Sequence, residues 1–378
     1  MPRRVLFWSE LFWPHIGGIE VFGSHLLRAL QGHGYNFAVV TSHSNLPLPD
    51  GANHEGARIF RFPFRMAFET RDAGLFLELR RRIVNLKQTY RPDLIHINAV
   101  SPSILLHVQT AESWPAPVLV TLHQEVLTKQ SDESTSLAGR LLRSADRVNS
   151  VSAAVLTQAH RLVPEIVSRS SVIHNGLCEP SMAPTVLPFA PARLLCLGRL
   201  TRQKGFDIAL AALSLIRTHF ANVRLVIAGD GVERRELEQQ IDELGLSGAV
   251  ECLGWVAPDQ IPTLINSATV VLMPSRFEGL PLAALQAAMA ARPIVASRVG
   301  GIPEVVVHQE TGLLVDPENA SALADAVTFL LANPAIAVEM GHSGRRRVQE
   351  VFSWEKCVVS YKNLYDQLTR ERVRKDSF

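Results

Sequence analysis

Short apolar stretches alternate with longer helical stretches along nearly the whole chain. In the first half the predicted strands are residues 5–8, 37–41, 59–62, 94–97, 118–123, 148–152 and 171–173. Most of them are continuously hydrophobic, as strands covered by helices on both faces are. A second series follows at 193–197, 223–228, 250–253, 269–273, 294–297 and 313–315, with helices between them such as 207–220 and 233–244. This alternation predicts parallel βαβ units.

A proline-rich stretch separates the two series. Asn175-Gly176 is followed by Pro180, Pro184, Pro188 and Pro191, which indicates a connection between domains. A chain of 378 residues is also long enough for two domains. We therefore predict an α/β protein of two doubly wound parallel-sheet domains facing a cleft, with a helical end from about residue 318. Ligands of such folds bind at the carboxyl ends of the strands.

Composition excludes several classes of protein. With 47% hydrophobic and 20% charged residues the chain suits a folded core, and its net charge of +2 is too small to indicate nucleic-acid binding. The four cysteines are widely spaced, which argues against a disulfide framework or a structural zinc site. The start of the sequence does not resemble a secretory leader, and the uncharged stretch 94–111 is too polar to span a bilayer. We expect a cytoplasmic protein.

A glycine pair follows the first predicted strand. Gly17 and Gly18 stand between that strand and a predicted helix. They let backbone N–H groups approach a ligand closely, and the helix start behind them favours an anion. A plain tight turn explains the same pair equally well, and the dinucleotide pattern G-x-G-x-x-G does not occur here.

Two cations occupy the loop after the predicted strand 193–197. Arg199 and Lys204 lie five positions apart, before the next predicted helix. Two positive charges at the carboxyl end of a strand suit a pyrophosphate, whose charge must be neutralised as a leaving group departs. The alternative is that both side chains only extend into solvent.

A carboxylate follows the predicted strand 269–273. Glu278 precedes a turn at Gly279 and Leu280, and a predicted helix begins at Leu282. In this place the carboxylate can hold sugar hydroxyls while the amides of the turn hold phosphate oxygens. The alternative is that Glu278 only interacts with the positive end of the helix.

The order of these motifs resembles family 4 of the retaining nucleotide-sugar glycosyltransferases. After the glycine pair come G-R-L-x-x-x-K-G from Gly198, E-G-L-P-L-x-x-L-x-A from Glu278 and R-P-I-V-A-S-x-V-G-G-I-P-E from Arg292. The resemblance covers essentially the whole chain. It implies the GT-B fold of two Rossmann-like domains, with the acceptor side at residues 1–180 and the donor side at 181–352. A C-terminal helix at 353–378 is then expected to pack back toward the first domain.

The resemblance also implies roles for individual residues. Gly17 and Gly18 would approach the donor phosphates or the acceptor. Arg199 and Lys204 would clamp the pyrophosphate, and Glu278 would bind the donor sugar. No metal ligand set is expected, because no D-x-D sequence occurs in the chain.

One position departs from the family pattern. Glu278 is similar to the first glutamate of the family's E-x7-E motif, and the second would fall at residue 286, where this chain has Gln286. The register holds on both sides, since Ala287 and Arg292-Pro293 match the family. A glutamine can still donate and accept hydrogen bonds but carries no charge. This departure bears on nucleotide affinity more than on chemistry.

His123 closes the predicted strand 118–123. A single histidine at a strand end is usually structural. Its position resembles that of a histidine near the donor sugar in the family, so we expect a catalytic role. His96 and His174 also end predicted strands, and for them we keep the structural interpretation.

The predicted function is transfer of a glycosyl group from a nucleotide diphosphate sugar, of UDP or GDP type, to a hydroxyl acceptor, with retention and without a metal. The acceptor class stays open among a glycan, a lipid-linked molecule and a small molecule. A nucleotide-sugar epimerase of similar fold is one alternative, and it would release product without an acceptor. A non-catalytic sugar-nucleotide-binding subunit is another, and it would bind the donor without turnover.

Arginines and aromatic residues gather in the first half, between Arg58 and Arg82. A solvated face explains the arginines, and contact with an anionic substrate or with the inner face of a membrane is the sharper alternative. Phe60 to Phe64 alternate at period two, which predicts an edge strand packed on one face.

Overall fold

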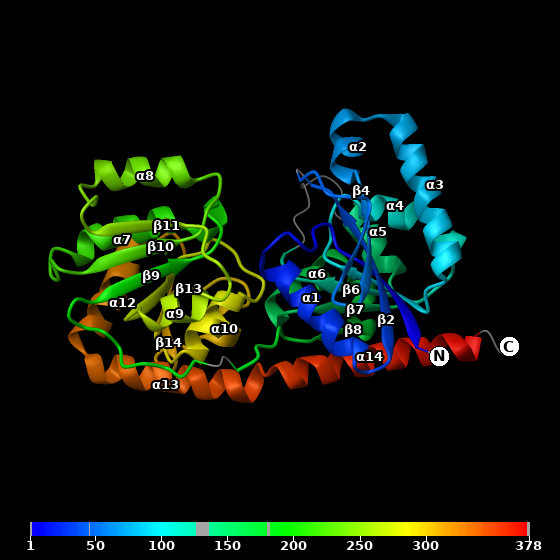
Figure 1. Ribbon diagram of the computed structural model, residues 1–378. Coiled ribbons are helices and arrows are strands. Elements are labelled where there is room, and N and C mark those ends of the chain that lie inside the picture. Colours follow the sequence, from blue (N-terminus) through cyan, green and yellow to red (C-terminus); the bar gives the residue numbers. More distant parts are fainter. Residues whose placement is uncertain (1, 45, 126–135, 180–181, 376–378) are drawn as a thin grey trace. The chain divides into compact units, whose positions relative to one another are not determined.

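The computed structural model describes residues 2–44, 46–125, 136–179 and 182–375, and for 371–375 the backbone alone. The chain divides into two units, each with its own sheet (Figure 1). Unit 1 consists of Met1–Asn175 and Glu355–Phe378, and unit 2 of Gly176–Trp354. The prediction of two parallel-sheet α/β domains is thereby confirmed.

Unit 1 has a sheet in the order β3-β4-β2-β1-β5-β6-β7-β8, parallel except for the pairing of β3 with β4. Its strands are β1 (Arg3–Trp8), β2 (Tyr35–Ser42), β3 (Gly51–His54), β4 (Ala57–Phe62), β5 (Leu94–Asn98), β6 (Val118–Leu122), β7 (Arg147–Ser150) and β8 (Ser170–Val172). Its helices are α1 (Gly18–Gln31), α2 (Phe64–Thr70), α3 (Ala73–Tyr90), α4 (Ile104–Gln109), α5 (Leu137–Ser144), α6 (Ala153–Leu162) and the last helix, α14 (Trp354–Lys375). Short 3-10 turns lie at Ala111–Ser113 and Pro164–Arg169.

The predicted edge strand at Phe60 to Phe64 is wrong in two respects. β4 ends at Phe62, and Phe64 begins α2. β4 is also not at the edge, because β3 pairs with it in antiparallel fashion. The connection between them has positive φ at both Glu55 (46°) and Gly56 (81°), the geometry of a tight hairpin turn that follows the twist of the strands.

Unit 2 has a six-stranded sheet in the order β11-β10-β9-β12-β13-β14, and every pairing in it is parallel. The strands are β9 (Arg193–Leu197), β10 (Arg224–Ala228), β11 (Val250–Gly254), β12 (Val270–Met273), β13 (Ile294–Ser297) and β14 (Gly312–Val315). The helices are α7 (Phe206–Ile216), α8 (Arg234–Glu243), α9 (Ile261–Asn266), α10 (Leu282–Met289), α11 (Ile302–Val305), α12 (Ala320–Ala332) and α13 (Pro334–Val351). Among the described helices none alone has the length and apolarity of a membrane span, although α12 and α13 pass that test as a pair bent by 104°.

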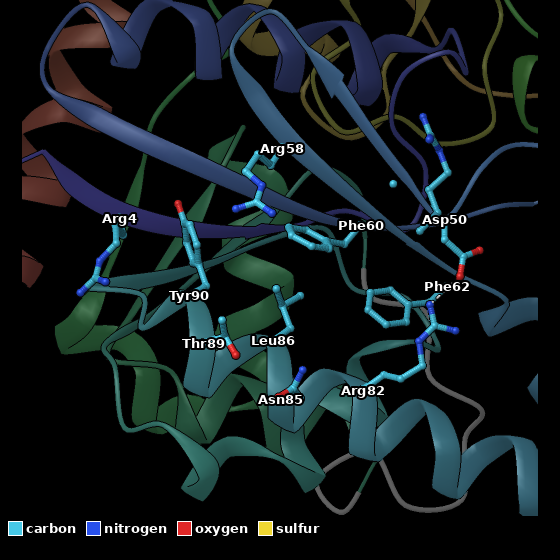
Figure 2. Close-up of a pocket in the computed structure, with 12 residues that line it drawn as sticks. Arg4, Asp50, Arg58, Phe60, Phe62, Arg82, Asn85, Leu86, Thr89 and Tyr90 are labelled. Carbon is cyan, nitrogen blue, oxygen red and sulfur yellow. Dashed lines mark hydrogen bonds and ion pairs between the residues drawn. The ribbon is translucent and has the colours of Figure 1, made fainter.

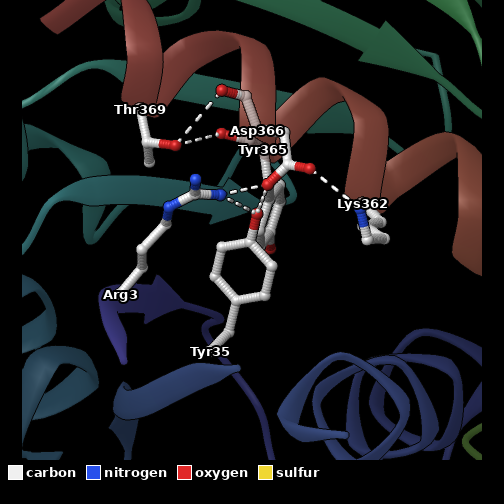
Figure 3. Close-up of polar contacts among 6 residues, drawn as sticks. All are labelled: Arg3, Tyr35, Lys362, Tyr365, Asp366 and Thr369. Carbon is white, nitrogen blue, oxygen red and sulfur yellow. Dashed lines mark hydrogen bonds and ion pairs between the residues drawn. The ribbon is translucent and has the colours of Figure 1, made fainter. Parts of the chain in front are cut away.

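The last helix, α14, is fastened to unit 1 by a cluster of polar contacts (Figure 3). The carboxylate of Asp366 accepts hydrogen bonds from Arg3 at the start of β1, from the hydroxyl of Tyr35 (2.6 Å) and from Lys362 (2.8 Å). Burial by itself raises the pKa of Asp366, but these three donors hold it well below its usual range. The helix therefore returns to the first two strands of the chain.

Two tyrosines of α14 reach deeper into unit 1. The Tyr365 hydroxyl lies 2.6 Å from Nδ1 of His96, and the Tyr361 hydroxyl accepts from the amide of Asn149 at 3.0 Å. Both tyrosines and both partners are buried. Nε2 of His96 pairs with the Thr121 hydroxyl at 2.8 Å, so both ring nitrogens are used inside the core. This agrees with the structural interpretation of His96.

Candidate functional site

The strand order of unit 2 reverses between β9 and β12. β9 pairs with β10 on one side and with β12 on the other, so the chain runs outward in both directions from this point. In doubly wound sheets such a reversal leaves a crevice outside the carboxyl ends of the two central strands. The loop after β9 carries Arg199 and Lys204, and the loop after β12 carries Glu278. The topology therefore brings the two predicted donor motifs together.

Lys204 and Glu278 are in direct contact. Nζ of Lys204 donates to Oε1 of Glu278 at 2.6 Å, and the buried Ser275 hydroxyl donates to the same oxygen at 2.8 Å. The Glu278 side chain is only 5% exposed. Within the described chain its second oxygen, Oε2, has no hydrogen-bond partner. A fixed carboxylate with one open oxygen can accept hydrogen bonds from a sugar, while two ammonium protons of Lys204 stay available for phosphate.

Arg276 and Gln203 hold the two loops together, and the sequence analysis missed both. The Arg276 guanidinium makes two hydrogen bonds to Asp207 at the start of α7, of 2.9 and 2.8 Å, and a third to Glu318 (2.9 Å). The backbone N–H of Arg276 donates to the carbonyl of Gln203, whose side chain donates to the carbonyl of Phe277. Arg276 is thus a positioning residue for Glu278. The one feature of the sequence that could have indicated this role is the position of Arg276, two residues before Glu278.

Two glycines allow close backbone approach at the donor loops. Gly229 follows β10 with φ +148°, and a Cβ there would lie 1.8 Å from the carbonyl oxygen of Gly198. Gly300 has φ +50°, and a Cβ there would lie 1.7 Å from the carbonyl oxygen of Glu278. No side chain fits at either position, because the nearest atoms are backbone. The loops after β10 and β13 therefore pack directly on the two donor loops.

The remaining donor residues surround this centre. Arg199 is exposed, and within the described chain its side chain makes no hydrogen bond or ion pair, which leaves the guanidinium free to meet a phosphate. Gly279 and Leu280 are buried in the turn, and Leu282 is the first residue of α10. The first amides of a helix have no partner within it and attract anions. Gln286 is half-buried on the same helix.

In unit 1 the strand order reverses between β1 and β5. Gly17 caps α1 after the β1 loop, with φ −159° and ψ 173°, and the exposed Gly18 is the first residue of the helix. The first turn of α1 also contains the buried Glu20. An acidic residue in this turn makes a neutral hydroxyl ligand more suitable than a phosphate. The two roles expected of Gly17 and Gly18, toward the donor phosphates or toward the acceptor, stay predictions.

His123 lies directly after β6, in contact with the end of β5 and with α1. Its Nε2 pairs with Oδ1 of Asn98 at 2.8 Å, and its ring meets the edge of Phe22 at 5.6 Å between centroids. Burial lowers the pKa of His123 to about 4. The imidazole is therefore neutral at pH 7, so it can orient a hydroxyl by hydrogen bonding but does not carry a proton to give away.

Two family models match the chain, one for each series of strands. "Glycosyltransferase Family 4" matches residues 16–178 and "Glycosyl transferases group 1" matches residues 182–347. The alpha-maltose-1-phosphate synthase of Mycobacterium tuberculosis is 30% identical over 322 residues, which are 73% of this chain and 82% of the relative. The glycogen synthase of the same organism is 28% identical over 386 residues, 93% of this chain and 91% of the relative.

A solved structure shares the whole architecture. The sucrose-phosphate synthase of Thermosynechococcus elongatus aligns with a TM-score of 0.85 and 25% identity, covering 98% of this chain and 100% of that one. The donor motifs at the strand reversal of unit 2, the two adjoining family models and this common architecture lead to one assignment. The chain belongs to family 4 of the glycosyltransferases and has the GT-B fold.

Proposed function

We propose that the chain transfers a hexosyl group from a UDP- or GDP-sugar to a hydroxyl acceptor with retention of anomeric configuration and without a metal ion. The observation that carries this proposal is the ion pair of the half-buried Lys204 with the buried Glu278, together with the exposed Arg199 in the same loop as Lys204. Two cations and a helix start can offset the charge of a diphosphate, which is the task that a metal ion performs in other enzymes. The open oxygen of Glu278 supplies an acceptor for a donor-sugar hydroxyl.

In the proposed reaction the acceptor attacks the anomeric carbon from the front face. The acceptor oxygen forms a bond to the anomeric carbon while the bond from that carbon to the diphosphate breaks on the same side. The proton of the acceptor hydroxyl passes to the departing phosphate oxygen. The protein then contributes position and charge stabilisation, since His123 is neutral and Glu278 is already bonded to Lys204.

Two measurements on the same reaction test retention and metal independence. Turnover is followed with and without EDTA, and the anomeric configuration of the product is determined by NMR. We expect full activity in EDTA and the configuration of the donor in the product. Loss of activity that added Mg²⁺ restores, or an inverted product, would contradict the proposal.

Donor identity is open to a thermal-shift screen. A ligand that binds only the folded protein raises its unfolding temperature, so the matching UDP- or GDP-sugar is expected to stabilise unit 2. An incubation with donor alone separates the alternatives, because an epimerase would form product in it. A protein that is stabilised but never turns over would be a binding subunit.

Location in the cytoplasm stays part of the proposal. The four cysteines are widely spaced along the sequence and form no C-x-x-C pair, a pattern that suits a reducing compartment. For peripheral membrane contact through residues 58–82, fewer arginines are available to bind anionic lipid than the sequence suggests. Arg61 is buried, and Arg65 and Arg82 form ion pairs with Glu69 and Asp50. Cell fractionation with and without high salt tests both statements.

A further inference from the structure

A pocket of about 570 Å³ lies in unit 1 between β4 and α3, which we call the β4–α3 pocket. Arg58, Phe60 and Phe62 alternate on one face of the strand, so all three line it. The opposite wall comes from one face of the helix, at positions 82, 85, 86, 89 and 90. Figure 2 shows the space enclosed by these two rows of side chains. None of its residues belongs to the donor motifs or to the glycine pair Gly17-Gly18.

One end of the β4–α3 pocket holds two arginines beside a tyrosine. In Figure 2 the ring of Tyr90 stands between the guanidinium groups of Arg4 and Arg58. The Tyr90 hydroxyl donates to the carbonyl of Asn36 at 2.8 Å, which fixes the ring as part of the wall. Burial raises the pKa of Tyr90, so the phenol stays neutral and adds no negative charge. The wall between the two cations is thus rigid and uncharged.

Both of these arginines are available to a ligand. Arg58 is exposed and stacks over Phe60 at 5.3 Å from the ring centroid, and within the described chain it has no hydrogen-bond or ion-pair partner. Arg4 forms an ion pair with Asp93, 3.8 Å from its Nε, but within the described chain its guanidinium makes no hydrogen bond. This end of the pocket therefore has one arginine without an acidic partner, Arg58, and a second, Arg4, whose guanidinium is paired with Asp93 but keeps its hydrogen-bond donors available.

The other end of the pocket differs in charge. There Arg82 pairs with Asp50 at 2.8 Å and lies over the ring of Phe62. The Arg61 guanidinium is also occupied, since it donates to the carbonyls of Pro49 and Trp13. Between the two ends the wall is apolar at Phe60 and Leu86, with exposed Asn85 and Thr89 at the rim. The pocket thus joins a cationic end to an apolar middle.

We propose that the β4–α3 pocket binds an organic phosphate, with the phosphoryl group between Arg4 and Arg58 and an apolar group against Phe60 and Leu86. Planar guanidinium groups match phosphate oxygens with paired hydrogen bonds. The ligand is either a soluble phosphoester or the headgroup of an anionic phospholipid, because both present the same chemistry. The site goes beyond the proposed transfer reaction, since it lies in unit 1 on residues to which that reaction assigns no role.

The test uses the full chain with two probes. Phenyl phosphate represents the soluble source and is titrated by calorimetry. Phosphatidylcholine vesicles with and without phosphatidic acid represent the lipid source and are assayed by co-sedimentation. We expect Arg58→Ala to weaken the binding of whichever of the two probes the wild-type protein binds, on the order of tenfold or more. Arg81→Ala is the matched control, since Arg81 is an exposed arginine of α3 outside the pocket, and it should leave binding unchanged.

A second variant distinguishes the contribution of the pocket's shape from that of its charge. Thr89→Trp narrows the rim without altering net charge, and it should weaken binding as strongly as Arg58→Ala. Saturable binding of phenyl phosphate assigns the site to a soluble phosphoester, and sedimentation that requires phosphatidic acid and Arg58 assigns it to a lipid headgroup. Absence of both, equal losses in Arg58→Ala and Arg81→Ala, or wild-type binding by Thr89→Trp would overturn the proposal. Each variant is first checked for an unchanged unfolding temperature.

Discussion

The two units differ in the residues that lie at and near the carboxyl ends of their strands. Unit 1 buries ionisable side chains there and in the adjoining core, as at His96, His107 and His123. The three histidines of unit 2, at positions 219, 308 and 342, are all exposed. Its loops combine side-chain contacts, such as that of Arg276 with Asp207, with backbone packed on backbone, as where Gly300 meets Glu278. Unit 1 therefore buries several histidines, and unit 2 adds close contacts of the backbone to the polar contacts of its loops.

This difference bears on how each unit responds to change. A buried neutral histidine costs free energy whenever it must take up a proton. A glycine contact responds to no change of pH, but it tolerates no added Cβ. We therefore expect unit 1 to be the pH-sensitive part and unit 2 the part most damaged by small substitutions in its loops. The following experiments test this contrast, beginning with the largest expected effect.

Glu278→Gln should give the largest loss of activity. The neutral amide removes the partner of Lys204 and the charged acceptor for the sugar. We expect kcat/KM to fall between a hundredfold and a thousandfold, which corresponds to a loss of about 3 to 4 kcal/mol of transition-state stabilisation. Glu251→Gln, at an exposed position of β11, is the control and should keep full activity. Near-normal turnover of Glu278→Gln would remove this carboxylate from the site.

Arg199→Ala should follow, with a loss of about 3 kcal/mol, on the order of a hundredfold in rate. The reason is that this exposed guanidinium would face the charge of the departing diphosphate. Steady-state kinetics measure the effect, and Arg224→Ala at the start of β10 is a control at the opposite end of the sheet. Equal kinetics of the two variants would show that Arg199 extends into solvent.

Acid should destabilise unit 1 selectively. Burial lowers the pKa of His96 to about 3 and that of His123 to about 4, whereas unfolded histidines titrate near 6.5. The unfolded chain therefore binds more protons below about pH 6.5, and stability falls as the pH falls from there toward about 4. Each histidine contributes a loss on the order of 2 kcal/mol at about pH 5.

Hydrogen exchange resolves this effect by unit. Between about pH 7 and about pH 5, amides of β5 and β6 should lose protection after correction for intrinsic rates, while those of β12 and β13 change less. Equal losses in both sheets would mean that carboxylates common to the two units dominate the acid response.

The smallest effect is expected at Gln286. A glutamate there would bind ribose hydroxyls through charge-assisted hydrogen bonds, so Gln286→Glu should tighten the nucleotide by about 1 kcal/mol, a few-fold in Kd, with little change in kcat. Calorimetry with UDP and GDP measures it. Weaker binding would show that Gln286 serves another partner, and turnover that rises from nothing would show that the natural protein is a binder.

The strands of both sheets could be predicted because most are continuous apolar runs. β9 and β13 have the predicted bounds, and most others differ by one or two residues. The strand β3, Gly-Ala-Asn-His, was missed because none of its residues favours strands. It exists because the hairpin turn at Glu55-Gly56 brings it against β4. Local pattern predicts elements that carry the core, and tertiary pairing supplies the rest.

The sequence predicts which residues make up the candidate site, but it does not predict the contacts between them. Motif order named Arg199, Lys204 and Glu278, but nothing in the spacing shows that Lys204 bonds Glu278 while Arg199 stays exposed. The Arg276 contact to Asp207 spans 69 positions, a separation that no local pattern records. Likewise the loops after β10 and β13 pack on the two donor loops at Gly229 and Gly300. The role of these glycines follows from the neighbouring backbone and not from their own surroundings in sequence.

The return of α14 to unit 1 sets the order in which the chain can finish folding during synthesis. Unit 2 is complete once residue 354 has left the ribosome, whereas unit 1 still lacks the helix that carries Tyr361, Tyr365 and Asp366. Until then the tyrosine partners of His96 and Asn149 are missing from the core of the part made first. Domains usually complete in the order of translation. Here the second unit to emerge is the first to be complete.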